Sequence, residues 1–373
     1  MGGHALVFGA SGITGWGVVN ALLSDYPTPD VFDRVTALTN RHLPAEDSGW
    51  PASKKLNIVS GLDLLSGEQA ALEKNLRQQV PKIETVSHVY FFAYIYNADN
   101  ETEIRINVDL LRRAVTSVDN LSDKLAFVTY GVHLLDRFPF AEKLPLAESL
   151  PAIPEPFKSK LFYYPQVELL KRLSAGKAWS WCDVIPDIVV GFVPNNNAYC
   201  LAQWLALYLS LFREINGPGA EVVFPGTKSW TIKSNDSNQD IIGRFAVYAS
   251  LHPEWSAGER YNVADNAQWS TWSGVAPTDG PGPDPSVYIQ ENKEKWFETE
   301  KKYGLKGGRV GNEKSLTIVS NFLMNQFDFD RQVDLTKMHA AWGNAKEETD
   351  VQGAWHVAFD RFRAANIIPS SFT

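Results

Sequence analysis

The feature that most constrains the fold of this chain is a glycine-rich segment that follows an apolar run. Residues 5–8 (Ala-Leu-Val-Phe) are typical of a short buried strand, and residues 16–23 are typical of a helix. Between them Gly9, Gly12 and Gly15 stand at the spacing G-x-x-G-x-x-G. Between a strand and a helix, such glycines allow a tight turn, a close approach of the backbone to a pyrophosphate, and close helix–strand packing. The segment therefore predicts a dinucleotide site.

The start of the predicted helix is the expected place of the phosphates. Unpaired N–H groups and the helix dipole favour negative charge at a helix N-terminus. Ser11 and Ile13 lie in the same turn as the three glycines, so we count both among the candidate cofactor contacts.

The residues after the second predicted strand, 33–39, indicate which dinucleotide is bound. An Asp or Glu at this point binds the ribose 2′-hydroxyl of NAD, whereas an Arg accommodates the 2′-phosphate of NADP. Here the strand ends without a carboxylate and is followed by Asn40 and Arg41. We therefore favour NADP(H) over NAD as the cofactor. Asp63, just past the third predicted strand at residues 56–59, is expected near the adenine.

Strand-like and helix-like segments alternate through the first half of the chain. The predicted strands are residues 5–8, 33–39, 56–59, 86–93, 125–130 and 179–185. Such alternation indicates βαβ units and an α/β fold with a doubly wound parallel sheet. We predict a Rossmann dinucleotide-binding core over residues 1–194. Residues 195–373 are predicted to form a smaller mixed α/β lobe that binds the substrate and packs on the core.

Composition limits the possible partners. The 373 residues carry a formal net charge of −8, which argues against nucleic acid because phosphate neutralisation needs a basic surface. The most apolar segment, residues 198–212, is too short to span a bilayer, so we expect no membrane association and either a buried helix or a homodimer face. No signal-peptide pattern precedes the first strand, and we expect a cytoplasmic protein. Cys182 and Cys200 lack metal-ligand spacing, so no metal is predicted.

Later segments add a family resemblance. Its carriers are the glycine loop 9–15, Asn40-Arg41, and residues 87–90, 162–168, 186–192, 224–226 and 260–263. The aromatic pair Tyr163-Tyr164 at a helix start, followed by Pro-Asp-Ile-Val-Val-Gly-Phe at 186–192, is the most specific part. Together these segments resemble the progesterone 5β-reductase/iridoid synthase-like branch of the extended short-chain dehydrogenases.

The resemblance implies a chemistry. In that family a hydride passes from NADPH to the β-carbon of an enone or enal, the second tyrosine of the pair binds the carbonyl oxygen, and a lysine after the fifth strand assists. Tyr164 would therefore be the catalytic hydroxyl, and Thr129 and Ile188 would be cofactor contacts. Hydride addition builds negative charge on the substrate oxygen, so a fixed hydrogen-bond donor beside that oxygen lowers the barrier.

The chain departs from the family pattern at the lysine. The family segment reads Thr-Gly-x-Lys-His, whereas residues 129–133 read Thr-Tyr-Gly-Val-His. Val132 stands at the lysine position and His133 matches the histidine. Since histidine titrates nearest to neutral pH, His133 is a second candidate catalytic residue. The nearest helical cations, Lys171 and Arg172, follow Tyr164 by about two helical turns.

Three functions remain open from the sequence. The first is an NADPH-dependent reductase of a hydrophobic enone, enal, ketone or imine, in specialised metabolism. The second is a non-redox cyclase or isomerase that retains the dinucleotide, and the third is a nucleotide-binding redox sensor. Aromatic side chains suit an apolar substrate. The candidate substrate contacts are Tyr94, Tyr96, Tyr130, Trp204 and Tyr208, with Phe138 and Phe140 in a proline-rich loop.

Overall fold

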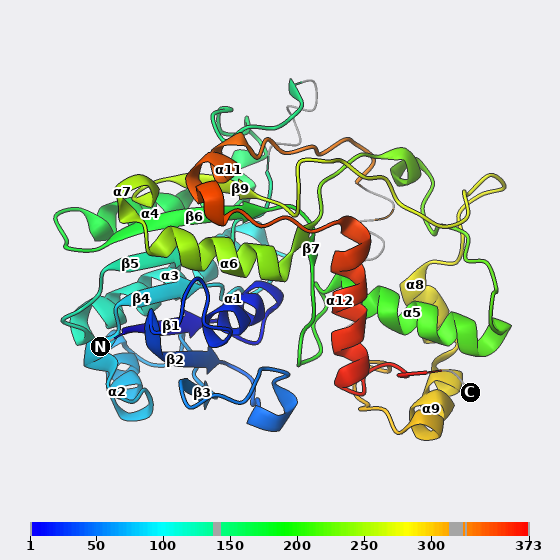
Figure 1. Ribbon diagram of the computed structural model, residues 1–373, viewed down its shortest axis with the longest axis horizontal. Helices are drawn as coiled ribbons and strands as arrows, with labels where there is room; N and C mark the ends of the chain where they lie inside the picture. The colour runs from blue at the N-terminus through cyan, green and yellow to red at the C-terminus, as the bar shows by residue number, and fades with distance from the viewer. Residues whose placement is uncertain (1, 137–142, 313–323, 325–326, 372–373) are drawn as a thin grey trace.

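The protein is built on one central parallel sheet. The computed structural model describes residues 2–136, 143–312, 324 and 327–371. Its seven strands run in the order β3-β2-β1-β4-β5-β6-β9, and every neighbouring pair is parallel (Figure 1). They are β1 Gly3–Phe8, β2 Phe32–Thr39, β3 Leu56–Ser60, β4 His88–Phe91, β5 Phe127–Tyr130, β6 Ser180–Pro186 and β9 Arg260–Val263. The predicted doubly wound α/β fold and its six strands are confirmed.

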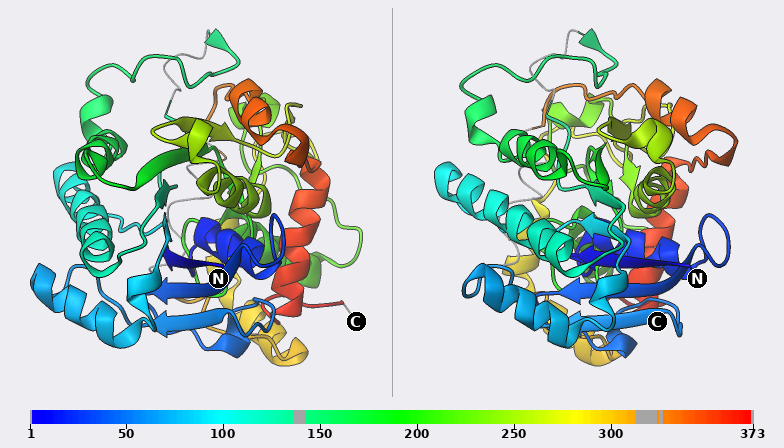
Figure 2. Two further views of the ribbon diagram at one scale, coloured as in Figure 1. Left: turned by 60° about the vertical axis from the view of Figure 1, so that its left-hand side comes forward. Right: turned by 90° about the vertical axis from the view of Figure 1, so that its left-hand side faces the viewer.

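Helices cover both faces of this sheet, because the strand residues alternate between two cores. Ala5 and Val7 of β1 pack into one apolar cluster, while Leu6 and Phe8 pack into the other. The first face carries α1 (Ile13–Leu23) and α6 (Gln239–Ser250). The second face carries α2 (Gln69–Gln79), α3 (Asn100–Leu121) and α4 (Tyr163–Ser174), as Figure 2 shows.

The sheet reverses its winding between β1 and β4. In open α/β sheets, ligands bind outside the carboxyl ends of the strands at such a switch point. The glycine loop follows β1 directly, so it lies at this point.

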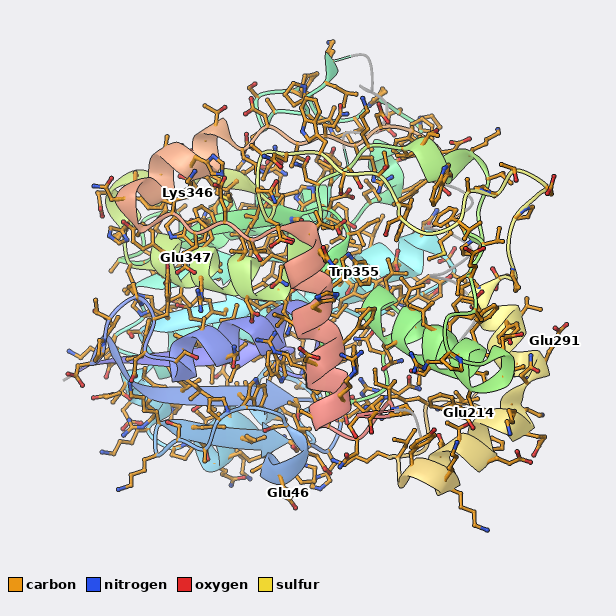
Figure 3. The ribbon with its side chains drawn as sticks, turned by 45° about the vertical axis from the view of Figure 1, so that its right-hand side comes forward. Glu46, Glu214, Glu291, Lys346, Glu347 and Trp355 are labelled. Atoms are coloured by element: carbon orange, nitrogen blue, oxygen red, sulfur yellow. The ribbon has the colours of Figure 1, made fainter. Side chains whose placement is uncertain are left out.

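A group of helices stands beyond the carboxyl end of the sheet (Figure 1). It contains α5 (Leu201–Asn216), α8 (Pro285–Glu291), α9 (Lys293–Tyr303) and α12 (Val351–Ala364). The ring of Phe362 in α12 lies 5.1 Å from that of Phe192, which in turn lies 5.3 Å from Trp16 of α1. In Figure 3, Trp355 projects from α12, and its indole N–H donates to Asp236 at 2.9 Å.

The chain returns to the sheet after leaving it. Both α6 and β9 lie within the segment 195–373, yet they belong to the central sheet and its helical layer. A short second sheet pairs β7 (Val189–Val190) with β8 (Ser237–Asn238). The division at residue 194 therefore stays a prediction for the lobe, with residues 237–263 added to the core. No helix in the described ranges combines the length and apolar character needed to cross a bilayer.

Helices α1 and α6 touch through their backbones at two glycines. A Cβ added at Gly17 would lie 2.2 Å from the carbonyl oxygen of Gln239, and one at Gly243 would lie 2.5 Å from the carbonyl oxygen of Gly17. Side chains larger than hydrogen have no room at this crossing. The crossing holds α1, and with it the glycine loop, in place on the sheet.

We predict that Gly243→Ala destabilises the protein. Helix propensity alone would make this change stabilising by about 1 kcal/mol. The clash with the α1 backbone should reverse the sign and cost about 1–3 kcal/mol. Urea unfolding measures the difference, with the exposed α2 change Lys74→Ala as control. A Gly243→Ala protein at least as stable as wild type would contradict the packing account.

Candidate active site

The glycine loop has the geometry of a dinucleotide cradle. Gly9 has φ +75°, and a Cβ there would lie 2.6 Å from the Phe92 backbone, just past β4. A Cβ at Gly15 would lie 2.3 Å from the Gly9 carbonyl oxygen. Gly12 is the N-cap of α1, and no acidic residue lies in the first turn. An uncapped helix N-terminus beside bare backbone fits a diphosphate.

Three further candidate cofactor residues lie past the ends of β2 and β3. Arg41 donates from Nη1 to the Asn196 carbonyl oxygen at 2.6 Å, and Asn40 donates to the Leu62 carbonyl oxygen at 3.4 Å. Asp63 follows directly and accepts a backbone hydrogen bond two residues on. The roles of these three side chains toward the adenosine half of a dinucleotide stay predictions.

A buried charge cluster lies past the end of β5. His133 is fully buried, and its Nδ1 lies 2.9 Å from both Asp183 Oδ2 and Arg260 Nη2. Arg260 also donates from Nε to the same Asp183 oxygen at 3.0 Å. On the other side of the ring, Nε2 lies 3.4 Å from Asp136 Oδ2. Three neighbouring strands, β5, β6 and β9, thus bring one imidazole, one guanidinium and two carboxylates together.

The charges of this cluster support one another. Burial lowers the pKa of His133, but the Asp183 charge and hydrogen bonds with Asp136 and Asp183 outweigh it, so the pKa lies above 6.5. For Arg260 burial also lowers the pKa, and Asp183 more than compensates. The cluster therefore favours the protonated imidazole, and with His133 protonated its two cations are balanced by two carboxylates.

Tyr164 is joined to this cluster through Asp136. Its hydroxyl donates to Asp136 Oδ2 at 2.5 Å and accepts from the Ile153 N–H at 3.1 Å. The preceding ring, Tyr163, stacks on His133 with centroids 4.4 Å apart. Both predicted catalytic residues, Tyr164 and His133, therefore contact the same carboxylate. The structure thus brings the two candidate catalytic residues together, and their catalytic roles stay predictions.

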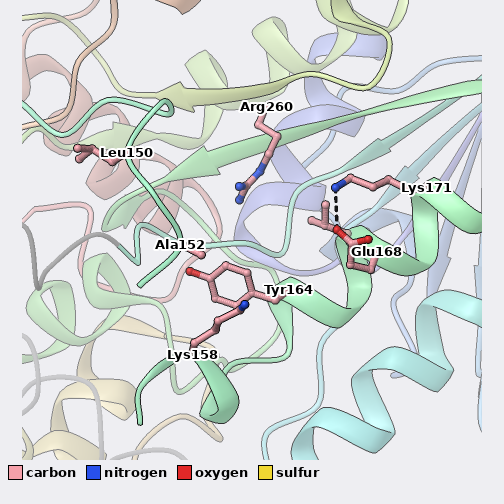
Figure 4. A pocket seen from close by; sticks show the side chains of 8 residues that line it. Leu150, Ala152, Lys158, Tyr164, Glu168, Lys171 and Arg260 are labelled. Atoms are coloured by element: carbon pink, nitrogen blue, oxygen red, sulfur yellow. Dashed lines mark hydrogen bonds and ion pairs between the residues drawn. The ribbon is translucent and has the colours of Figure 1, made fainter. Parts of the chain in front are cut away.

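A cavity of about 320 Å³ opens beside Tyr164 (Figure 4). In that view Arg260 from β9 and Tyr164 from α4 both reach toward it, and Lys158 lies 5.6 Å from the Tyr164 ring centre. The lining residues are Leu150, Ala152, Lys158, Tyr164, Val167, Glu168, Lys171 and Arg260. Lys171, two turns from Tyr164, lies on this same cavity and pairs with Glu168 at 2.7 Å.

Sequence reasoning missed Arg260, Asp183 and Asp136 as site residues. Arg260 begins one of the segments that carry the family resemblance, but the segment was not predicted to be a strand. Its pairing with β6 places Arg260 opposite Asp183. A buried Asp in a strand and an Arg at the start of another were the only signals available.

Three of the five predicted substrate residues lie in the core, and their contact with substrate stays a prediction. Tyr130, Trp204 and Tyr208 are buried and lie outside the lining of the cavity. The Tyr130 hydroxyl donates to Gln166, and the indole N–H of Trp204 donates to the carbonyl oxygen of Ala198, just before α5. Tyr208 packs edge-on against another ring, 5.4 Å away, between α5 and α8. In the structure these three rings take part in the packing of the core and the lobe.

Tyr94 and Tyr96 do lie at the carboxyl edge, just past β4. Tyr94 donates to Glu103, and its ring lies 5.7 Å from that of Tyr199. Tyr96 is 47% exposed beside the same Tyr199. Their contact with substrate stays a prediction. Phe138 and Phe140 lie outside the described residues.

Other candidate residues of the core are closed to solvent. Thr129 is fully buried in β5, and Ile188 is buried just after β6. Cys182 and Cys200 are free, buried thiols. Within the described ranges, no three His, Cys, Asp or Glu side chains are grouped so that they could hold a metal ion.

Comparison with known proteins identifies the family. The PRISE-like Rossmann-fold domain matches residues 5–369. The short chain dehydrogenase sirQ of Leptosphaeria maculans is 32% identical over 98% of this chain and 97% of its own length. The short chain dehydrogenase ausT of Aspergillus calidoustus is 37% identical over 74% of this chain and 70% of its own. The chain therefore belongs to the PRISE-like Rossmann-fold family, and the expected enzyme of the extended short-chain dehydrogenase class is confirmed.

A solved structure shares the fold at greater distance. The Bordetella bronchiseptica enzyme WbmG, in complex with NAD and UDP, superposes with a TM-score of 0.59 over 99% of this chain and 97% of its own. The two sequences are 12% identical. This likeness concerns the fold of the sheet and its flanking helices.

The raised pKa of His133 predicts a pH-dependent stability. A group whose pKa is higher in the folded state stabilises the fold fully below its unfolded pKa, near 6.5, and this contribution is lost as pH rises through the folded value. The unfolding free energy of wild type relative to His133→Gln should therefore fall above pH 6.5, by at most about 1.4 kcal/mol per pH unit. Urea titrations between pH 6 and 9 test this. A difference that stays constant or grows with pH would show that the imidazole is not held protonated.

Proposed function

We propose that this protein is an NADPH-dependent reductase of a small molecule whose carbonyl or imine group accepts a hydrogen bond from Tyr164. The observation that carries the proposal is the Tyr164 hydroxyl, which belongs to a residue that lines a cavity and is linked through Asp136 to a buried cluster of two cationic groups and two carboxylates. The glycine cradle supports a dinucleotide, and the related fold of WbmG holds NAD. The bound dinucleotide would supply the hydride.

The residues of the chain would divide the cofactor contacts between them. The N–H groups at the start of α1 face the diphosphate, with Ser11 and Ile13 beside it. Arg41 takes the 2′-phosphate, because a guanidinium presents several donors to phosphate oxygens. Asn40 and Asp63 stand by the adenosine.

Tyr164 would stabilise the negative charge that develops on the substrate oxygen. In the structure its O–H donates to Asp136, so a bound carbonyl must take over that hydrogen bond. A donor held at the point where charge develops is worth several kcal/mol in the transition state. Position 132, where the family has lysine, is valine, and we infer that Arg260 and protonated His133 supply the missing positive charge.

The cavity suggests what kind of molecule fits. Leu150, Ala152 and Val167 supply apolar surface, whereas Lys158 and Arg260 supply charge. This mixture suits a hydrophobic molecule with a polar oxygen-bearing end, such as an enone, enal, ketone or imine. The charged lining residues also allow a more polar substrate than the aromatic residues of the sequence predict.

A non-redox isomerase or cyclase is the second candidate. Val132 at the lysine position favours it, because a hydrogen-bond donor in a shaped cavity suffices for such steps. The two functions differ in one measurable way. A reductase consumes NADPH in proportion to product, followed at 340 nm, whereas an isomerase forms product without net consumption.

We predict that Tyr164→Phe lowers the rate of hydride transfer by about 10²-fold or more, because one donor to the developing negative charge is removed. The dissociation constant for NADPH should change less than about twofold. Single-turnover kinetics and a fluorescence titration measure the two quantities. Tyr303→Phe in α9, which removes a hydroxyl from the lobe, is the control. A rate for Tyr164→Phe equal to that of the control would remove Tyr164 from the mechanism.

A further inference from the structure

Two arginines from distant parts of the chain hold the same loop. Arg41 follows β2, whereas Arg309 follows α9 in the lobe. Arg41 Nη1 donates to the carbonyl oxygen of Asn196 at 2.6 Å, and Arg309 Nη2 donates to that of Pro194 at 2.7 Å. The two guanidinium groups therefore converge on residues 194–196, next to the end of β2.

Arg309 is buried without an anionic partner of its own. It is 6% exposed, and in the described part of the chain its Nε has no hydrogen-bond partner. Burial lowers its pKa to about 10, and the positive charge of Arg41 acts in the same direction. A buried guanidinium beside a second one is costly unless an anion is placed between or beside them.

The carboxylates whose charge acts on Arg309 are engaged elsewhere. These are Asp47 and Glu300. Asp47 accepts from Lys306 at 2.5 Å, and Glu300 accepts from the indole N–H of Trp296 at 2.7 Å. Asp47 ends the short helix η1 (Ala45–Asp47), whose Glu46 is labelled in Figure 3. Neither carboxylate forms an ion pair with Arg309 or Arg41 among the described residues.

We propose that Arg309 and Arg41 together form the site of the 2′-phosphate of NADP, so that the lobe itself selects NADP over NAD. The proposal rests on the cofactor use proposed above and adds a residue outside the sheet to it. Arg41 stands at the strand end where an arginine accommodates this phosphate. The unpartnered Nε of Arg309 adds a donor, and the planar fork of a guanidinium matches a phosphate.

Binding rather than turnover tests this site. Quenching of protein fluorescence gives the dissociation constants of NADPH and NADH for wild type and Arg309→Gln. We expect Arg309→Gln to bind NADPH about tenfold or more weakly, which is about 1.4 kcal/mol per factor of ten, and NADH within about twofold of wild type. Lys306→Gln is the matched control, because Lys306 is a neighbouring cation that already pairs with Asp47. It should leave the NADPH-to-NADH ratio unchanged.

Two results would overturn the proposal. One is an equal loss of NADPH and NADH affinity in Arg309→Gln, which would mark a purely structural residue. The other is an unchanged NADPH affinity in a folded Arg309→Gln protein.

A second measurement needs no unstable variant. Calorimetry of the wild-type chain with 2′,5′-ADP and with 5′-AMP should show about tenfold or tighter binding of the bisphosphate. Arg309→Lys should lose part of that difference, because an ammonium is a point charge without the guanidinium fork. A wild-type chain that binds both nucleotides equally, or neither, sinks the proposal.

The inference and the proposed function can fail separately. Loss of NADPH preference in Arg309→Gln, in a protein that reduces no enone, ketone or imine, would support the phosphate site and reject the reductase. Turnover of a carbonyl substrate with equal use of NADPH and NADH would support the reductase and reject the phosphate site.

Discussion

The close contact of three backbone segments, with no room for a Cβ, is the constraint on which the rest of this structure depends. Gly15 lies against Gly9, and Gly17 lies against Gln239 and Gly243 across the α1–α6 crossing. These contacts seat α1 on the sheet with its N-terminus at the switch point between β1 and β4. The same approach that packs the helix therefore places its N–H groups where a diphosphate can reach them.

The buried charge cluster is a consequence of strand order. His133, Asp183 and Arg260 meet because β5, β6 and β9 are adjacent, although β9 lies far along the chain. Asp183 stabilises both cations, and Asp136 connects them to Tyr164. Under the proposed function, Arg260 and His133 would supply the positive charge for which the related enzymes use a lysine. Such a cluster keeps its charge because each buried ion has a partner of opposite sign.

The lobe does more than cover the sheet. Its helices bury Trp204 and Tyr208 in their own packing. The lobe also brings Arg309 to the end of β2, where the sheet supplies Arg41. Under the proposal above, cofactor selection would then depend on how the lobe packs on the core.

The sequence by itself determined six of the seven strands and the dinucleotide loop, because apolar runs, glycine spacing and helix periodicity are local signals that act over a few residues. Through the family segments around them, it also identified Tyr164 and His133 as candidate catalytic residues. It did not determine the partners of these residues, nor whether Trp204 faces a pocket or a core, since an aromatic residue on an apolar helix has the same pattern in both cases. The tertiary structure decided that Arg260 lies opposite Asp183 and that Arg309 lies near Arg41. Both are contacts between residues far apart in the chain, and they form only when the sheet and the lobe pack together.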